Sequence, residues 1–205
     1  MVISMTIILQ RQRPSAPLCG LGSEARSAIA EGERDYPWDD DALRSAWQTE
    51  LDLLAAALRT ESDSDASGAI REFLELRDQR RAMLTPEQID YERQREWTEG
   101  LAKYVELTIW RAADQASECA PVAALARDGD FHDYGSADRK WSQEIDQMRR
   151  MAGDHGDGRF YYSGMAQAAL LDRVATGWTS RRLLPEVFQE DLLREAVSVA
   201  AVPPQ

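Results

Sequence analysis

Three glutamates that are close together in the chain are the residues best placed to do chemistry. Glu92, Glu96 and Glu99 are spaced by four and three positions, which places their carboxylates on neighbouring turns of one helical face. Like charges at this spacing repel each other mildly, unless they face water or have a cation or arginine side chains between them. The pattern therefore allows a cation site. The ordinary alternative is a solvated acidic face beside neighbouring arginines and a lysine.

The segment around these glutamates resembles a metal-ligand helix of the gluzincin metallopeptidases, the thermolysin-like and aminopeptidase-like superfamily. Residues 96–105 read EWTEGLAKYV, which is similar to the Glu-Gly-x-Ala-x-Tyr segment of that superfamily. The resemblance implies that Glu99 is the third zinc ligand. A carboxylate on a rigid helix holds a fixed direction toward a metal. The glycine that follows it, Gly100, would let two ligand helices come close.

A second resemblance lies downstream, where residues 161–172 read YYSGMAQAALLD. This segment is similar to the Tyr-x-x-Gly helix of aminopeptidase-like gluzincins. The resemblance implies a catalytic role for Tyr161, whose hydroxyl would stabilise the oxyanion, with Tyr162 as the alternative. A phenol suits that role because it donates a hydrogen bond without carrying charge at pH 7. The chain departs from the family at Ser163, where lysine is common, and an aromatic pair can also simply anchor a helix start.

The histidine helix of the family is missing from this chain. The motif His-Glu-x-x-His does not occur, and His132 and His155, the two histidines, both follow Glu99 and have no partner at i+4. The resemblance, which covers residues 92–175, thus implies the C-terminal half of a gluzincin or a scaffold that has lost its metal site. We expect a truncated or degenerate metallopeptidase-like helical domain. The complete family uses zinc, whereas this chain alone should hold none and should cleave no peptide.

Two other interpretations remain open at this point. The chain could be a non-catalytic helical protein-interaction module that binds a peptide or protein through an exposed apolar face or through its N-terminal segment. It could also be an enzyme of another type that uses Glu96, Glu99 and Tyr161 without a metal. A calcium site in the acidic loop at 128–133 is a poorer hypothesis, because the glycine and glutamate that such loops need are absent.

The elements that must position these residues are predicted to be helices. Apolar residues recur at helical spacing in several segments, which indicates a mainly α fold of five to six helices with little sheet. The longest helix should begin at Thr85 with a capping box and Pro86 and run to about Gln115. Gly100 lies in its middle, which predicts close packing against its backbone. The other expected helices cover residues 39–58, 69–81, 137–152, 160–175 and 185–202, and residues 61–68 are expected to form a solvated loop.

The chain divides into two parts by pattern. Residues 1–38 are expected to be an irregular N-terminal segment or a lone strand, and residues 39–205 a helical domain. The first nine residues are apolar and rich in β-branched side chains, which favours a strand. They lack the basic start of a secretory signal, because the first basic residue is Arg11.

Composition limits the partners and the compartment. The 205 residues include 36 acidic and 24 basic side chains, a net charge of −12. Such a surface repels phosphate backbones and anionic lipids, so we expect neither nucleic acid nor membrane as a partner. No apolar run approaches the roughly 20 residues that cross a bilayer. The two cysteines, Cys19 and Cys119, suggest no disulfide framework and fit a reducing cytoplasmic location.

Overall fold

The computed structural model describes residues 32–116, 123–124, 127, 136–154, 156–181 and 187–199. The expectations for the N-terminal apolar run, both histidines, both cysteines and the acidic loop at 128–133 lie outside these residues. The described helices, in chain order, are α3 (Asp41–Arg59), α4 (Asp63–Arg81), α5 (Pro86–Arg95), the π-helix η1 (Glu96–Gly100), α6 (Leu101–Gln115), α7 (Ala137–Met148), the 3-10 turn η3 (Met151–Gly153), α8 (Gly158–Val174), α9 (Trp178–Arg181) and α10 (Gln189–Val199).

The prediction of a mainly α fold is confirmed, and the described residues contain no strand. The long central helix is present as α5, η1 and α6, which follow one another without a break. Its start is the predicted capping box, in which Thr85 and Gln88 each accept a hydrogen bond from the other's backbone N–H. Within this helix the π turn at η1 was not expected. It inserts extra backbone and changes the facing of the residues around it.

The segment expected to be a solvated loop is largely helical. Helix α4 begins at Asp63, because the Ser62 hydroxyl accepts from the backbone N–H of Asp65 and caps the helix. Asp63 and Asp65 in its first turn also suit the positive end of the helix dipole. The prediction of a loop over residues 61–68 is therefore wrong beyond Ser62. The aspartates of this segment belong to the first turn of a helix.

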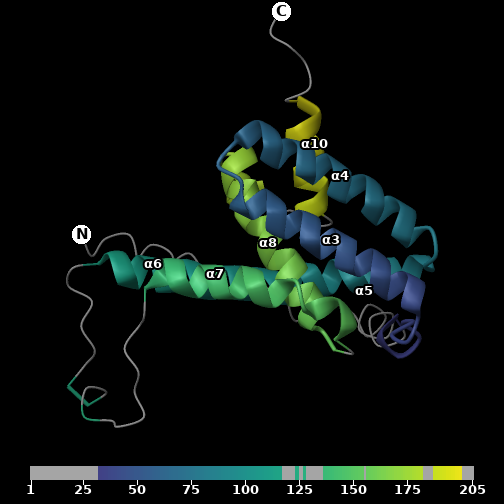
Figure 1. The fold of residues 1–205 in the computed structure, drawn as a ribbon, viewed down its shortest axis with the longest axis horizontal. Coiled ribbons are helices and arrows are strands. Elements are labelled where there is room, and N and C mark those ends of the chain that lie inside the picture. The colour runs from purple at the N-terminus through teal and green to yellow at the C-terminus, as the bar shows by residue number, and fades with distance from the viewer. Residues whose placement is uncertain are drawn as a thin grey trace, which may run out of the picture.

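The helices form a body and a projecting arm (Figure 1). Helices α3, α4, α8 and α10 pack on one another in the body, and α5 runs beneath them. Helices α6 and α7 lie alongside each other and extend away from this body. We refer to α6 and α7 together as the arm.

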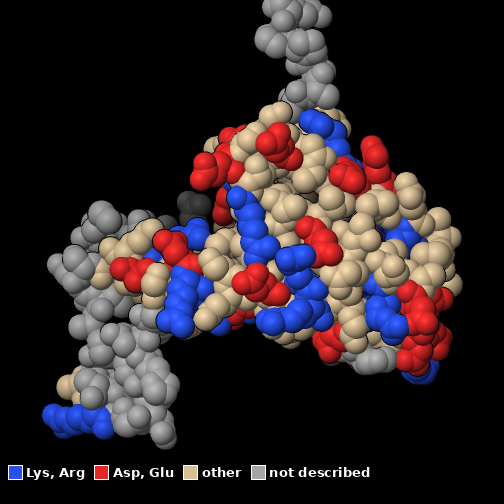
Figure 2. Space-filling view, in the orientation of Figure 1, with Lys and Arg blue, Asp and Glu red and all other residues tan. Residues whose placement is uncertain are grey.

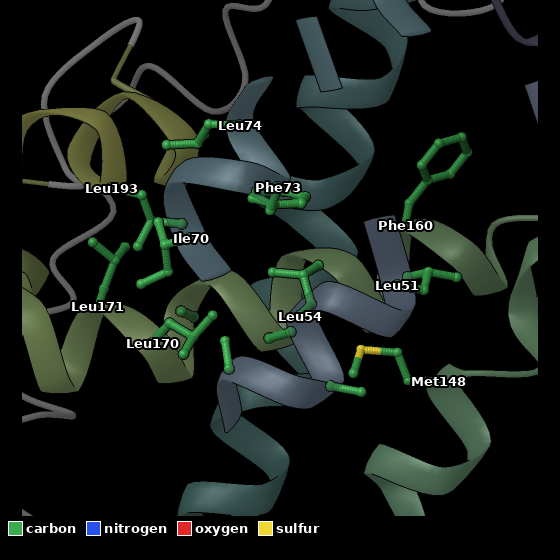
Figure 3. Close-up of a cluster of buried hydrophobic side chains, with 14 of the residues drawn as sticks. Leu51, Leu54, Ile70, Phe73, Leu74, Met148, Phe160, Leu170, Leu171 and Leu193 are labelled. Carbon is green, nitrogen blue, oxygen red and sulfur yellow. The ribbon is translucent and has the colours of Figure 1, made fainter. Parts of the chain in front are cut away.

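The apolar core lies between α3, α4, α8 and α10 (Figure 3). Trp47, Leu51 and Leu54 of α3 are fully buried, as the four-and-three spacing of apolar residues predicts. Figure 3 shows Leu51 between Phe160 of α8 and Met148 of α7, and Leu54 near Phe73 of α4. Leu193 of α10 lies beside Ile70 and Leu171. Burial of such side chains contributes about 1.5–3 kcal/mol each to the stability of the fold.

The long central helix (α5, η1 and α6) crosses α8 at two glycines. A Cβ added at Gly100 would lie 2.4 Å from the Cα of Gly164, and one added at Gly164 would lie 2.2 Å from the carbonyl oxygen of Glu96. These neighbours are backbone atoms, so they cannot move aside cheaply. The close packing predicted at Gly100 is therefore confirmed, and the partner is the glycine of the Tyr161–Gly164 segment.

The described surface carries charges of both signs. Figure 2 shows acidic and basic side chains interspersed over the body and the arm on this face. None of the described helices is long and apolar enough to cross a bilayer.

Candidate functional site

Glu99 and Tyr161 lie together on the surface where η1 meets α8. The side chain of Glu99 is 28% exposed, and its carboxylate lies 3.6 Å from Nη1 of Arg95. The neighbouring Glu99 carboxylate is the main cause that raises the pKa of the Tyr161 hydroxyl, with burial second. The structure thus brings together the two residues that the resemblance singled out.

Tyr162 points elsewhere and belongs to a different set of contacts. Its hydroxyl donates to Oε2 of Glu144 on α7 at 2.9 Å, and the Lys103 ammonium lies 4.9 Å from the centre of its ring. Burial and this hydrogen bond raise the pKa of Tyr162. Lys103 also binds Glu144 at 2.8 Å, so these residues join α6, α7 and α8 at the base of the arm.

The donor set around Glu99 does not fit a zinc ion. Its neighbours are the cation of Arg95 and the neutral phenol of Tyr161, whereas zinc needs several anionic or imidazole ligands. Arg95 also lies 3.6 Å from Asp157 and 3.4 Å from Glu33, so an arginine stands at the centre of these three carboxylates. Within the described part of the chain, no group of three or more acidic, histidine or cysteine side chains could hold a metal.

Glu92 and Glu96 turn into the protein and meet arginines of α4. Both of their side chains are buried, so the alternative of a solvated acidic face is wrong for these two residues. The Arg77 guanidinium donates to both carboxylate oxygens of Glu96, at 2.6 and 2.7 Å. Glu92 accepts from Arg80 Nη2 at 3.0 Å and from Arg81 Nε at 2.9 Å. Arginines lie between these carboxylates, which is the arrangement that makes such close like charges favourable.

Glutamates from two further helices complete this set. Glu50 of α3 accepts from Arg77 Nε at 3.1 Å, and Glu190 of α10 accepts from Arg81 Nη1 at 2.6 Å. We call the group the arginine–glutamate cluster; its members are Arg77, Arg80, Arg81, Glu50, Glu92, Glu96 and Glu190. Arg93 lies at the edge, where its Nε is 3.0 Å from Glu190 and its Nη2 is 2.6 Å from Asp191. The cluster thus joins four helices and η1.

Polar groups of neighbouring elements satisfy the remaining oxygens of the cluster. Tyr36 donates to Glu92 at 2.5 Å and itself accepts from the Trp47 indole at 2.9 Å. Ser163 of α8 donates to Glu96, and it accepts from Arg77 Nη2 at 2.9 Å. The residue at which the chain departs from the gluzincin pattern is therefore a buried partner of this cluster.

Titration of the cluster is governed by the arginines. Burial alone would raise the pKa of Glu92, but the charges of Arg80 and Arg81 and the hydrogen bonds from Arg80 and Tyr36 lower it to about 2. Burial alone would likewise raise the pKa of Glu190, but the charges of Arg81 and Arg77 lower it to about 2. Both carboxylates are ionised at neutral pH. General acid–base catalysis instead needs a pKa near the working pH and contact with a substrate.

Sequence reasoning missed the arginines and Glu50, although the chain carries a signal for them. Arg77 and Arg81 continue the stripe of Ile70 and Leu74 at steps of three and four, so they fall on the buried face of α4. Glu50 similarly lies between the buried Trp47 and Leu51 on α3. Charges of opposite sign inside the apolar stripes of different helices indicate buried ion pairs.

Comparison with protein-family models, with curated proteins and with solved structures finds no match to this chain.

Proposed function

We propose that this chain is a helical protein-interaction module without chemistry of its own, and that the arm carries its contact surface. The observation that carries this proposal is the exposure of apolar side chains on α6. Ile109 is 57% exposed and Val105 is 40% exposed, and they lie one helical turn apart. Leu101 and Leu107 of the same helix are buried. Apolar residues on both faces of a helix are typical of a helix that is covered on both sides.

The state of the carboxylates also supports a binding role over catalysis. The glutamates of the arginine–glutamate cluster are buried and paired with arginines, so they stabilise helix packing and do not face a substrate. The partly exposed Glu99 lies 3.6 Å from Arg95 and beside Tyr161. Charge pairs of this kind favour a rigid scaffold that presents a fixed surface.

Photo-crosslinking tests this proposal. We expect a photoreactive phenylalanine analogue placed at Ile109 to give a discrete cross-linked product with one protein in the native host. The same analogue at Met83, which is 56% exposed in the connection between α4 and α5, should give none. Cross-linking at Ile109 no stronger than at Met83 would contradict the proposal.

A degenerate gluzincin is a second candidate for the origin of this module. Two observations favour it: the Glu99 carboxylate lies close enough to the Tyr161 hydroxyl to raise its pKa, and the glycines of both motifs, Gly100 and Gly164, touch. These are the residues on which the resemblance rests. Descent from such an enzyme is compatible with a binding role today, because a helical scaffold can outlast its metal site.

Metal analysis and a peptidase assay test whether the chain has chemistry of its own. We expect the purified chain to hold no stoichiometric zinc and to cleave no peptide, since the described neighbours of Glu99 are poor metal ligands. One zinc per chain, together with hydrolysis that Glu99→Gln abolishes, would show instead that the metallopeptidase site works.

A further inference from the structure

A cavity of about 270 Å³ lies in the corner between the arm and the body (Figure 1). Its wall is formed by α6 and α7 of the arm and by the C-terminal halves of α3 and α8. Helix α6 contributes Tyr104, Leu107, Thr108 and Arg111, whose steps of three, one and three place them on one face. The exposed apolar residues of α6 do not line the cavity. It is therefore separate from the proposed contact surface.

Apolar side chains from four helices line this cavity. Leu58 of α3, Leu107 of α6, Trp141 of α7 and Ala169 of α8 each contribute to its wall. Leu107 is buried and the other three are partly buried, so the packing of the fold sets their positions. Binding sites for small molecules have mainly apolar walls with a few polar groups, and their volumes start at about 300 Å³. The volume of this cavity is near that lower limit and suits a small molecule.

Arg111 supplies a cation without a counter-ion in the wall. Its guanidinium lies 5.3 Å from the centre of the Trp141 ring and forms no ion pair with any residue that the structure describes. Asp114, which follows one turn later on α6, instead accepts a hydrogen bond from the backbone N–H of Ala137 at 2.9 Å. Contact with a ring uses the face of a guanidinium and leaves the N–H donors at its edge, which match the two oxygens of a carboxylate. Arg111 can therefore bind a carboxylate beside an apolar wall.

The other charged side chains of the wall already have partners. Arg173 binds Asp63 at 2.6 Å and donates to two backbone oxygens at the end of α3. Asp172 accepts from the Tyr104 hydroxyl at 2.7 Å and from the Trp178 indole at 2.9 Å, so each of its oxygens has a donor. Both donors are neutral, so a negative charge remains at this end of the cavity. Two turns of α6, or about 10 Å along its axis, separate Tyr104 from the unpaired cation.

We propose that this cavity binds a small organic monocarboxylate with an apolar body. The carboxylate pairs with Arg111, and the apolar body lies against Trp141, Leu107 and Leu58. A dicarboxylate fits less well, because its second charge approaches Asp172, and Arg111 repels a cationic ligand. The proposal goes beyond the binding function proposed above, because it needs no protein partner.

Three probes of one shape test the charge preference: phenylbutyrate, the neutral phenylbutanamide and the cationic phenylbutylamine. Nuclear magnetic resonance titration of the full chain should show saturable binding of phenylbutyrate in about the millimolar range, as expected for a ligand of this size. The acid should bind about fivefold or more tighter than the amide, and the amine should bind weakest. Equal affinities, a preference for the amine, or no saturable binding would overturn the proposal.

Loss of the guanidinium tests the role of Arg111. Arg111→Gln should lower the affinity for phenylbutyrate about fivefold or more and change that for the amide less than about twofold. Arg139→Gln is the matched control, because Arg139 is an exposed arginine of α7 outside the wall. It removes the same charge and should change both affinities less than about twofold. Equal losses in the two variants would mean a general charge effect and would overturn the proposal.

Filling the cavity tests the place of binding. Ala169→Leu adds volume inside the wall and should weaken phenylbutyrate and the amide alike, about tenfold or more. Ala56→Leu, at an exposed position of α3 outside the wall, should change both affinities less than about twofold. Unchanged binding by Ala169→Leu, with circular dichroism showing a folded chain, would overturn the assignment to this cavity.

A polypeptide C-terminus is another source of an apolar carboxylate. A short peptide that ends in phenylalanine should bind more weakly than phenylbutyrate, because the cavity is small. Tighter binding of this peptide that is lost when its C-terminus is amidated would assign the cavity to a protein partner and overturn the proposal. Photo-crosslinking at Ile109 reports on the exposed apolar residues of α6 and ligand titration reports on the cavity, so failure of either proposal is seen separately.

Discussion

The glutamates Glu92, Glu96 and Glu99 of the long central helix have different roles, although their spacing is that of residues on one helical face. Glu92 and Glu96 are buried among arginines, whereas Glu99 is partly exposed and lies beside Arg95 and Tyr161. The π-helix η1 contains both Glu96 and Glu99, so one buried and one surface carboxylate lie within a single turn of the backbone.

At the residue scale, Glu96→Gln should destabilise the fold strongly. The change leaves the fully buried Arg77 without its bidentate partner, and breaking one side of a buried ion pair costs about 3–5 kcal/mol. Glu99→Gln, the same chemical change three residues away at a half-exposed site, should cost no more than about 1 kcal/mol. Urea unfolding monitored by circular dichroism measures both free energies of unfolding.

A paired substitution guards this prediction against simple failure to fold. Replacing Arg77 and Glu96 together by Met and Leu removes both charges at that contact, although Glu50 and Glu190 then lose an arginine. The double variant should therefore lose less free energy of unfolding than the sum of the losses in Arg77→Met and Glu96→Leu. Additive losses would mean that Arg77 and Glu96 are not coupled.

At the element scale, the crossing of η1 and α8 depends on glycine. Gly100→Ala should destabilise the protein by about 1–3 kcal/mol or more, because its Cβ would collide with the backbone of Gly164. Gly68→Ala is the matched control within α4, where an added Cβ meets nothing within 4 Å. That change should stabilise by about 0.5–1 kcal/mol, since alanine loses less entropy in a helix. Thermal melts that move both variants in the same direction would contradict the crossing.

Helices and their faces could be predicted from sequence, because local chemistry determines them. The capping box at Thr85 and the apolar spacing of Leu43, Trp47, Leu51 and Leu54 depend on neighbours within a few residues. The start of α4 was missed because aspartates and serines favour both loops and helix starts. The η1 turn was missed because no short pattern predicts a π turn.

The burial of Glu92 and Glu96 could not be predicted from the sequence of the long central helix alone. The arginines that pair with Glu92 and Glu96 lie on α4, and the cluster is completed by Glu50 of α3 and Glu190 of α10. Such pairings depend on which helices meet. The pairing of Glu99 with Tyr161 was anticipated only through a family resemblance, and its role in the molecule stays a proposal.

At the scale of the whole molecule, the arginine–glutamate cluster makes stability depend on acid pH. The pKa values of Glu92 and Glu190 fall from 4.5 to about 2 on folding. Below pH 4.5 the unfolded chain therefore binds more protons than the folded one. Their contribution is complete above about pH 4.5 and is lost as the pH falls toward 2. Urea unfolding at a series of pH values should show an uptake of about two protons at pH 3–4. A free energy of unfolding that does not change with pH over this range would contradict this prediction.

The cluster also constrains how the protein is made. Arg77 and Arg81 bind Glu190, which follows them by 113 and 109 positions along the chain. During synthesis α4 leaves the ribosome long before α10. Until α10 follows, Arg77 and Arg81 lack Glu190 as a partner and are either incompletely paired or exposed to water. The cluster is therefore completed only after α10 has been translated, and a ribosome stalled before that point would hold a chain open to chaperones and proteases.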